Sequence, residues 1–246
     1  MFRYKILIEY DGTNFIGWQS QPKGKSVQKN LEKFISKILK EKIKCVAAGR
    51  TDRGVHAYGQ VAHFDCKQNI TNTNKFLKSL NHFLYNGGVV IIDIKKKNKN
   101  FHARYSAKYR IYRYIIINRI ARPILLKDRA WHIINKLDLK LMKKGSKKLL
   151  GTNDFSTFRS SKCNAKSPIK TMEYIKIFSL NGKILIEFKS ESFLQHQVRS
   201  MVGCLKYLGE KKWTLTKFEK VFRSKKRIFC APPAPPHGLY LKKVVY

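Results

Sequence analysis

One polar stretch between two apolar runs limits what this chain can fold into. Gly49 to Asp65 reads GRTDRGVHAYGQVAHFD, follows the short apolar run Cys45–Ala48, and contains the alternating run Val61–Phe64 near its end. Short apolar runs and strict alternation are typical of β-strands. The sequence therefore predicts two strands joined by a polar loop, with Asp52 at the centre of that loop.

The residues around Asp52 have two possible explanations. Glycines in the loop allow the backbone to turn tightly or to approach a ligand closely. Cations and hydrogen-bond donors surround the carboxylate: Arg50, Thr51, Arg53 and His56. On these residues alone, an aspartate that fixes a turn explains the pattern better than a catalytic aspartate does.

The charge of the chain predicts a polyanionic partner. Lys and Arg number 52 against 15 Asp and Glu, which gives a formal net charge of +37. Many lysines can equally cover solvated faces. However, residues 94–127 and 155–172 contain no acidic residue and interleave basic side chains with aromatics or with Ser and Asn. This distribution suits phosphate contact and base stacking, so we expect a nucleic acid as partner.

Size and motifs narrow the class further. The 246 residues, 43% of them hydrophobic, suffice for two modest domains or one large one. No run is long enough for a membrane span and no apolar signal segment opens the chain, so we expect a cytoplasmic protein without a membrane partner. Cysteines and histidines show no ligand spacing, and no nucleotide-binding motif is present. We therefore expect neither a metal nor a cofactor.

The order of predicted elements indicates two α/β halves, 1–100 and 101–246, joined by a basic connector at 95–100. The first half combines periodic helices with alternating strands: strands 3–9 and 89–94, helices 27–39 and 76–84. In the second half we expect strand 110–118, helix 139–150, a hairpin across Asn181-Gly182, a helix around 198–208 and a helix capped by Thr216. GLYLKKVVY closes the chain as a strand.

The loop sequence resembles the motif of the TruA family of tRNA pseudouridine synthases, which is close to G-R-T-D-x-G-V-H-A-x-G-Q-V-x-H-F. The resemblance continues in family order through EYDGTNFIGWQ, FHARYSAKYRIYRYI, FLQHQVRSMVG and APPAPPHGLYL. It thus covers essentially the whole chain.

The resemblance implies an α+β fold in which two α/β halves form one extended, mostly antiparallel sheet, with helices on one side and a basic central cleft. It implies an isomerase that converts uridine to pseudouridine at positions 38, 39 and 40 of the tRNA anticodon stem-loop, works as a homodimer and needs no cofactor. Two other classes compete: a non-catalytic RNA-binding protein, and an N-glycosidase that releases uracil. Neither of these remakes a glycosidic bond.

The resemblance also assigns roles to single residues. Asp52 is implied as the nucleophile or base toward the ribose, Tyr112 as the ring that stacks on the flipped base, and Arg199 as the partner of the catalytic aspartate. Arg50 matches the arginine that fills the gap left by the base. The remaining expected substrate contacts are Arg53, His56, Gln60, Trp18, Arg104, Leu239 and Leu241. Without the resemblance, Tyr112 reads as a packing residue and Arg199 as a surface cation, whereas Trp18 and the two leucines fit packing about as well as substrate contact.

Two positions depart from the family pattern. Arg53 stands where the family usually has alanine, which places an extra charge beside Asp52. Asn86-Gly87-Gly88 replaces the usual L-P-x-D type of turn. The role of Arg53 and the conformation of this turn are therefore left open by the sequence.

Overall fold

A computed structural model describes residues 1–246, which divide into two compact units. The first unit comprises Met1–Lys108 and Tyr240–Tyr246, and the second comprises Tyr109–Leu239. The division therefore differs from the expected boundary at residue 100, because residues 101–108 and 240–246 belong to the first unit. None of the helices combines the length and apolar character that a membrane crossing requires.

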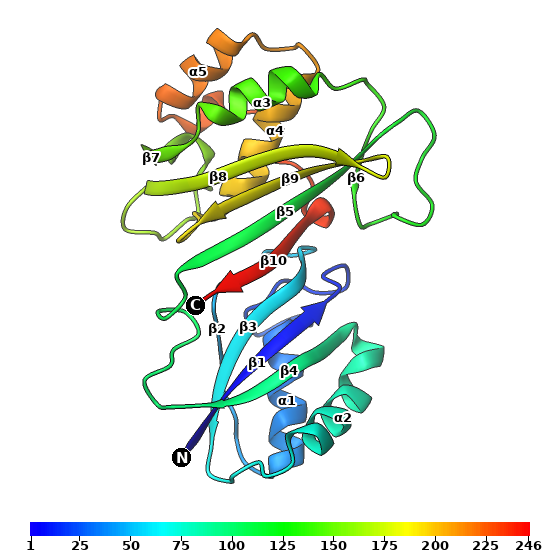
Figure 1. Cartoon of the computed structure of the whole chain (residues 1–246), viewed down its shortest axis with the longest axis vertical. Helices are drawn as coiled ribbons and strands as arrows, with labels where there is room; N and C mark the ends of the chain where they lie inside the picture. Colours follow the sequence, from blue (N-terminus) through cyan, green and yellow to red (C-terminus); the bar gives the residue numbers. More distant parts are fainter. The chain divides into compact units, whose positions relative to one another are not determined.

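The first unit is a mostly antiparallel sheet with two helices on one face (Figure 1). Its strands are β1 (Phe2–Tyr10), β2 (Cys45–Ala47), β3 (His56–Cys66), β4 (Val89–Lys97) and β10 (Leu239–Val245), and its helices are α1 (Val27–Leu39) and α2 (Thr73–Leu84). The strand order is β4-β1-β3-β10, with β2 also paired to β3. β1 runs antiparallel to β3 and β4, whereas β10 runs parallel to β3.

Alternation and capping explain these elements. Tyr4, Ile6 and Ile8 alternate along β1 and are fully buried. Ser26 caps α1, as predicted, by accepting a hydrogen bond from the Lys29 amide. The predicted helices and strands of this half are confirmed, but β4 continues through Lys97 into residues expected to form the connector.

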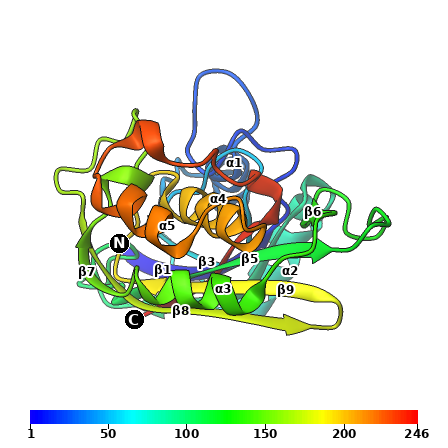
Figure 2. The same ribbon diagram turned by 90° about the horizontal axis from the view of Figure 1, so that it is seen from above.

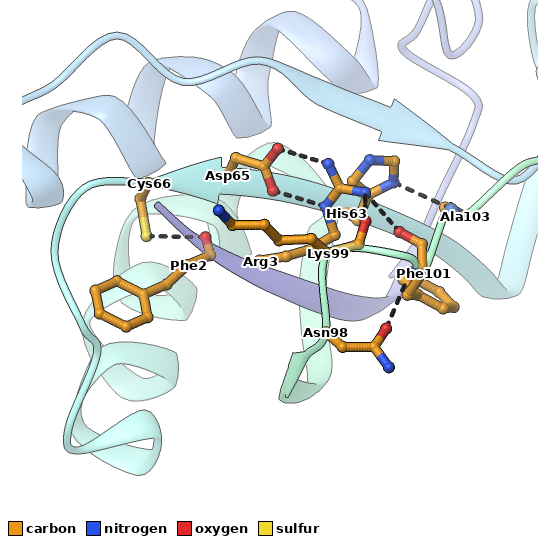
Figure 3. Close-up of polar contacts among 9 residues, drawn as sticks. All are labelled: Phe2, Arg3, His63, Asp65, Cys66, Asn98, Lys99, Phe101 and Ala103. Carbon is orange, nitrogen blue, oxygen red and sulfur yellow. Dashed lines mark hydrogen bonds and ion pairs between the residues drawn. The ribbon is translucent and has the colours of Figure 1, made fainter.

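An arginine fastens the segment after β4 to the first unit (Figure 3). Arg3 donates from Nε and Nη2 to Asp65, each at 2.7 Å, and from Nη1 to the carbonyls of Lys99 and Phe101, also at 2.7 Å. The Tyr246 hydroxyl donates to the Ala103 carbonyl at 2.8 Å. These contacts explain why residues 98–108 pack with the first unit rather than acting as a free linker.

The second unit is also α+β. Its strands are β5 (Tyr109–Asn118), β6 (Trp131–Ile133), β7 (Gly151–Asp154), β8 (Ile169–Leu180) and β9 (Lys183–Ser190), in the order β5-β9-β8-β7, with β6 parallel to β5. Its helices are α3 (Leu139–Lys147), α4 (Gln197–Gly209) and α5 (Leu215–Arg223). α3 packs against α4, α5 and β8 (Figure 2). The α+β class with mostly antiparallel pairing is thus confirmed.

Residue-level contacts explain which predictions for the second unit are confirmed and which are corrected. Asn181 and Gly182 have φ values of 49° and 71°, as the predicted two-residue hairpin requires. α3 ends at Lys147, earlier than expected. Its Gly145 lies so close to α4 that an added Cβ would meet Leu208 Cδ2 at 2.3 Å. The predicted Thr216 cap is wrong, because Thr214 caps α5 by accepting from the Lys217 amide at 3.1 Å.

Candidate active site

The loop that carries Asp52 is a tight turn between β2 and β3. The Ala48 amide donates to the Val61 carbonyl at 2.8 Å, and the Val55 amide donates back to the Asp52 carbonyl at 3.2 Å. Gly54 completes the turn with a φ of 74°, in the region that glycine adopts without strain. Asp52 is half-buried, while its neighbours Arg50 and Arg53 are exposed. The turn thus places one carboxylate between two solvent-facing cations.

A second segment, Gly12–Trp18, packs directly on this turn. The Trp18 amide donates to the Thr51 carbonyl at 3.1 Å, and the Gly54 amide donates to the Phe15 carbonyl at 3.4 Å. Gly17 has a φ of 120°, and an added Cβ there would meet the Thr51 carbonyl oxygen at 2.8 Å. The two segments therefore hold each other through their backbones, and Gly17 is required by both its conformation and its close contact.

Buried polar side chains support the turn from below. The Tyr10 and Thr51 hydroxyls form a hydrogen bond of 2.7 Å, and burial raises the pKa of Tyr10 despite this bond. Gln60 donates from Nε2 to the Gly49 carbonyl at 2.8 Å and accepts the Val61 amide at 3.1 Å. The predicted substrate contact of Gln60 stays a prediction. In this structure the completely buried side chain of Gln60 bonds the loop backbone.

His56 is held by the same Gly12 segment. The Gly12 amide donates to His56 Nδ1 at 3.0 Å, and Asp11 Oδ1 also lies 3.0 Å from that nitrogen. Asp11 Oδ1 also accepts from the Thr13 amide and hydroxyl, at 3.1 and 2.7 Å.

The glycine turn that departs from the family pattern contacts this segment. The Asp11 amide donates a hydrogen bond to the carbonyl of Gly88 at 3.0 Å, and Gly88 has a φ of 76°. Tyr85–Gly87 form a short 3-10 helix just before it. The turn therefore supports the segment that packs on the Asp52 loop.

Trp18 and the aromatic neighbours of His56 lie mostly in the interior. Trp18 is 2% exposed and its ring centroid lies 6.2 Å from that of Tyr10. The Tyr240 ring stacks on His56 at 4.7 Å and on Tyr58 at 4.6 Å. This placement makes Trp18 part of the packing behind the loop, and its predicted contact with substrate stays untested.

In the second unit, Tyr112 lies on β5. Its side chain is 9% exposed and meets Phe193 edge to face, with ring centroids 5.1 Å apart. Two residues further along the strand, Tyr114 donates its hydroxyl to the Pro235 carbonyl at 2.8 Å. The two tyrosines therefore share one face of β5, as the alternation predicts.

Arg199 is fixed in the first turn of α4. Its Nε donates to the Ala234 carbonyl at 2.7 Å, while the Ala234 amide donates back to the Arg199 carbonyl at 2.9 Å. Burial lowers the pKa of His237, with Asp128 acting in the opposite direction and Arg199 in the same one. Arg199 is thus half-buried and anchored by the proline-rich segment, which a helix-edge surface cation would not be.

Three further predicted residues are located as follows. Leu239 and Leu241 are buried on β10, and Leu241 pairs with Ala57 of β3. Arg104 is exposed in the segment after β4, with its guanidinium 5.6 Å from the Tyr105 ring. Across the chain, no group of three or more His, Cys, Asp or Glu side chains is arranged to hold a metal ion.

Sequence reasoning missed the residues that hold the site rather than form it. Tyr10, Gly17 and Ala234 belong to matched stretches, but only their tertiary partners reveal what they do. A glycine between two aromatic or apolar residues, as in FIGWQ, was the available signal for Gly17.

A half-buried carboxylate on a rigid turn, flanked by exposed arginines, can act as a nucleophile or base on a polyanionic substrate. Comparisons with known proteins show the family. The family model described as tRNA pseudouridine synthase matches residues 6–106 and 146–246. The chain belongs to the tRNA pseudouridine synthase family, which isomerises uridine to pseudouridine in tRNA.

Relatives that carry the name tRNA pseudouridine synthase A match along the full chain. The protein from Pelagibacter ubique is 65% identical over 246 residues, covering 100% of both chains. The protein from Parvibaculum lavamentivorans is 43% identical, also with complete coverage of both. The protein from Paramagnetospirillum magneticum is 44% identical, over 100% of this chain and 96% of its own.

Proposed function

We propose that this protein isomerises uridine at positions 38, 39 and 40 in the anticodon stem-loop of tRNAs, with Asp52 as its catalytic carboxylate. The reaction breaks the bond between ribose C1′ and uracil N1, rotates the base and rejoins it through C5. It consumes no redox partner. The observation that supports the proposal best is the Asp52 turn itself. The close approach of Gly17 to the Thr51 carbonyl, the Gly54–Phe15 backbone hydrogen bond and the Tyr10–Thr51 hydrogen bond hold it in place.

The remaining chemistry follows from the need to extract the target base from RNA. Unstacking leaves a gap, and an exposed arginine next to the catalytic turn is suited to fill it, which is the role we propose for Arg50. We propose that Tyr112 stacks on the flipped uracil and that Leu239 and Leu241 contribute the apolar surface beneath it. These assignments rest on the motif matches and on the burial of the three side chains.

We further propose that Arg199 is the cationic partner of Asp52 during turnover. The FLQHQVRS match supports this, and so does the anchoring of Arg199 by Ala234, which fixes its side chain before any substrate binds. A fixed planar guanidinium keeps a carboxylate charged and directed in a site from which the flipped base excludes water.

Binding of tRNA is proposed to depend on the basic surface as a whole. The net charge of +37 supports many phosphate contacts. Arg53, His56, Gln60, Trp18 and Arg104 are proposed as substrate contacts on the motif matches, although His56, Gln60 and Trp18 are buried in this structure. A cytoplasmic location and a homodimer follow only from the family likeness and complete the proposal.

The decisive experiment incubates the protein with unmodified tRNA. A uridine product of unchanged mass, located at positions 38 to 40 by pseudouridine-specific chemical labelling, supports the proposal. Released uracil indicates an N-glycosidase, and binding without any product indicates a non-catalytic RNA-binding protein.

A matched pair of variants tests the carboxylate. Asp52→Asn should abolish the product while leaving tRNA affinity within about threefold, because affinity rests on many phosphate contacts. Asp93→Asn makes the same change at a partly exposed carboxylate of β4 that pairs with Lys95, and should leave turnover at the wild-type rate. Full activity in Asp52→Asn contradicts the catalytic assignment.

A further inference from the structure

Two cysteines of the second unit lie in contact. Cys204, on α4, and Cys230, just after the short 3-10 helix Arg227–Phe229, have their Sγ atoms 3.5 Å apart. Both thiols are free. Cys204 is completely buried, whereas Cys230 is partly exposed, so an oxidant in solution can approach the second residue more readily than the first.

Arg227 places a cation beside the partly exposed member of the pair. Its Nη1 donates to Cys230 Sγ at 3.2 Å and to the Ser200 hydroxyl at 2.7 Å. The hydrogen bond with Cys204 and the Arg227 guanidinium lower the pKa of the Cys230 thiol, while burial opposes them. The same cysteine contact and burial raise the pKa of Cys204. A thiolate beside a cation, with a second thiol in reach, is the arrangement of redox-reactive cysteine pairs.

We propose that Cys230 and Cys204 form a hydroperoxide-reactive pair that closes to a reversible disulfide. The Cys230 thiolate attacks the outer oxygen of the hydroperoxide, the O–O bond breaks, and the alkoxide or hydroxide leaves and takes up a proton. Cys230 is then a sulfenic acid and the peroxide has been reduced by two electrons. The Cys204 thiol loses its proton and attacks the Cys230 sulfur, the S–O bond breaks, and water leaves. A dithiol returns both residues to thiols.

The position of the pair gives the disulfide a structural meaning. Cys204 shares α4 with Arg199, and Cys230 opens the segment that reaches Ala234, the partner of Arg199. Helix α4 and this segment are also closely packed: a Cβ added to Gly203 of α4 would meet the Pro232 carbonyl oxygen at 2.1 Å. The bond would therefore fasten α4 covalently to the segment that anchors Arg199.

The test treats the full-length protein with hydrogen peroxide and follows each cysteine by peptide mass spectrometry. We expect a Cys204–Cys230 disulfide, with loss of two hydrogen atoms, to form at least about tenfold faster than any oxidation of the buried Cys163. Dithiothreitol should reverse it. Oxidation spread equally over the five cysteines, or direct conversion of Cys230 to a sulfinic acid, would overturn the proposal; neither outcome bears on the synthase activity.

Three variants separate the role of Cys230, which attacks the peroxide, from that of Cys204, which closes the disulfide. Cys204→Ala removes the resolving thiol, so Cys230 should stop as a sulfenic acid that dimedone traps. Arg227→Gln should slow the reaction of Cys230 several-fold by removing the cation. Cys163→Ala is the control and should leave the disulfide yield unchanged. An equal dimedone yield in wild type and Cys204→Ala contradicts the pairing, and the wild-type mapping decides the matter if a variant does not fold.

Discussion

The hydroxyl of Tyr10 lies 2.7 Å from the hydroxyl of Thr51, and both side chains are buried. Tyr10 ends β1 and Thr51 immediately precedes Asp52, so a single hydrogen bond connects a core strand to the residue beside the proposed catalytic carboxylate. The orientation of the loop is therefore determined by the core of the first unit, and not by the loop residues alone.

Tyr10→Phe should lower the single-turnover rate by more than its loss of folding stability explains. Loss of the hydroxyl leaves a buried partner unsatisfied, which lowers the free energy of unfolding by about 1–2 kcal/mol and loosens the turn. Tyr4→Phe is the matched control. Tyr4 lies on the same strand as Tyr10, and its hydroxyl accepts a hydrogen bond from the Ile70 amide at 2.7 Å. Chemical denaturation and single-turnover rates for both variants check this; equal loss of turnover in the two would show that only stability matters.

Gly17→Ala should damage the active site through the backbone. The residue has a φ of 120°, and the new Cβ would meet the Thr51 carbonyl oxygen at 2.8 Å, so the turn below it must shift. Gly182→Ala also places a side chain at a positive φ, 71°, but in open space. We expect turnover to fall at least about tenfold in Gly17→Ala and to stay near wild type in Gly182→Ala. Similar rates in both variants would contradict the role of the contact.

Arg199→Lys should lower turnover by about a hundredfold or more, with tRNA affinity nearly unchanged. Lysine keeps the charge but loses the planar fork, including the Nε that donates to the Ala234 carbonyl. Arg199→Ala should be slower still. Arg223→Lys makes the same exchange at an exposed position of α5 and serves as control. A wild-type rate in Arg199→Ala would make Arg199 an ordinary structural or phosphate-contacting residue.

Affinity for tRNA should fall steeply with salt. Each phosphate neutralised by Lys or Arg releases counterions, so log K against log salt should have a slope of several units. Filter binding or fluorescence anisotropy between about 50 and 200 mM salt measures this slope. The same slope is expected for Asp52→Asn, because the carboxylate binds no phosphate. A flat dependence would mean that the basic surface does not serve RNA.

Acid should destabilise the fold between about pH 6.5 and 4 because of His63. Burial, together with the charges of Arg3 and His102, lowers the His63 pKa to about 4, while Asp65 acts in the opposite direction. His63 Nδ1 also accepts the Ala103 amide at 3.1 Å (Figure 3). In this pH range the unfolded chain therefore binds a proton at His63 that the folded chain does not bind. The stability is complete above the unfolded pKa and is lost as the pH falls toward the folded one.

His63→Asn keeps an acceptor for the Ala103 amide and removes this titration. Unfolding free energies measured against pH should show a shallower acid limb in the variant, by roughly 1 kcal/mol across the window, since solvent screens part of the effect. An unchanged slope would assign the acid sensitivity to other groups.

Local patterns were enough for most of the elements. The alternation in β1, the Ser26 cap of α1 and the Asn181-Gly182 turn each depend on neighbouring residues, and each is confirmed. The errors occurred where distant contacts decide. β4 continues through Lys97 because β1 pairs with it that far, and two short strands, β6 and β7, exist only through their partners β5 and β8.

The candidate site shows the same limit. Motif matches singled out Asp52, Tyr112 and Arg199 as candidate site residues, and their roles stay predictions. They could not indicate that Gln60 bonds the Gly49 carbonyl or that Ala234 anchors Arg199. Such contacts use backbone atoms, which every residue carries, so the side chains leave no trace of them in the sequence.

The pairing of β10 with β3 has a consequence for how the protein is made. Tyr240 and Leu241 pair with His56 and Ala57, directly after the Asp52 turn, although the entire second unit separates them in the chain. During translation the first unit emerges first but lacks this strand until the whole second unit has been synthesised. A ribosome that stops within the second unit therefore releases a chain in which the sheet beside Asp52 still lacks β10.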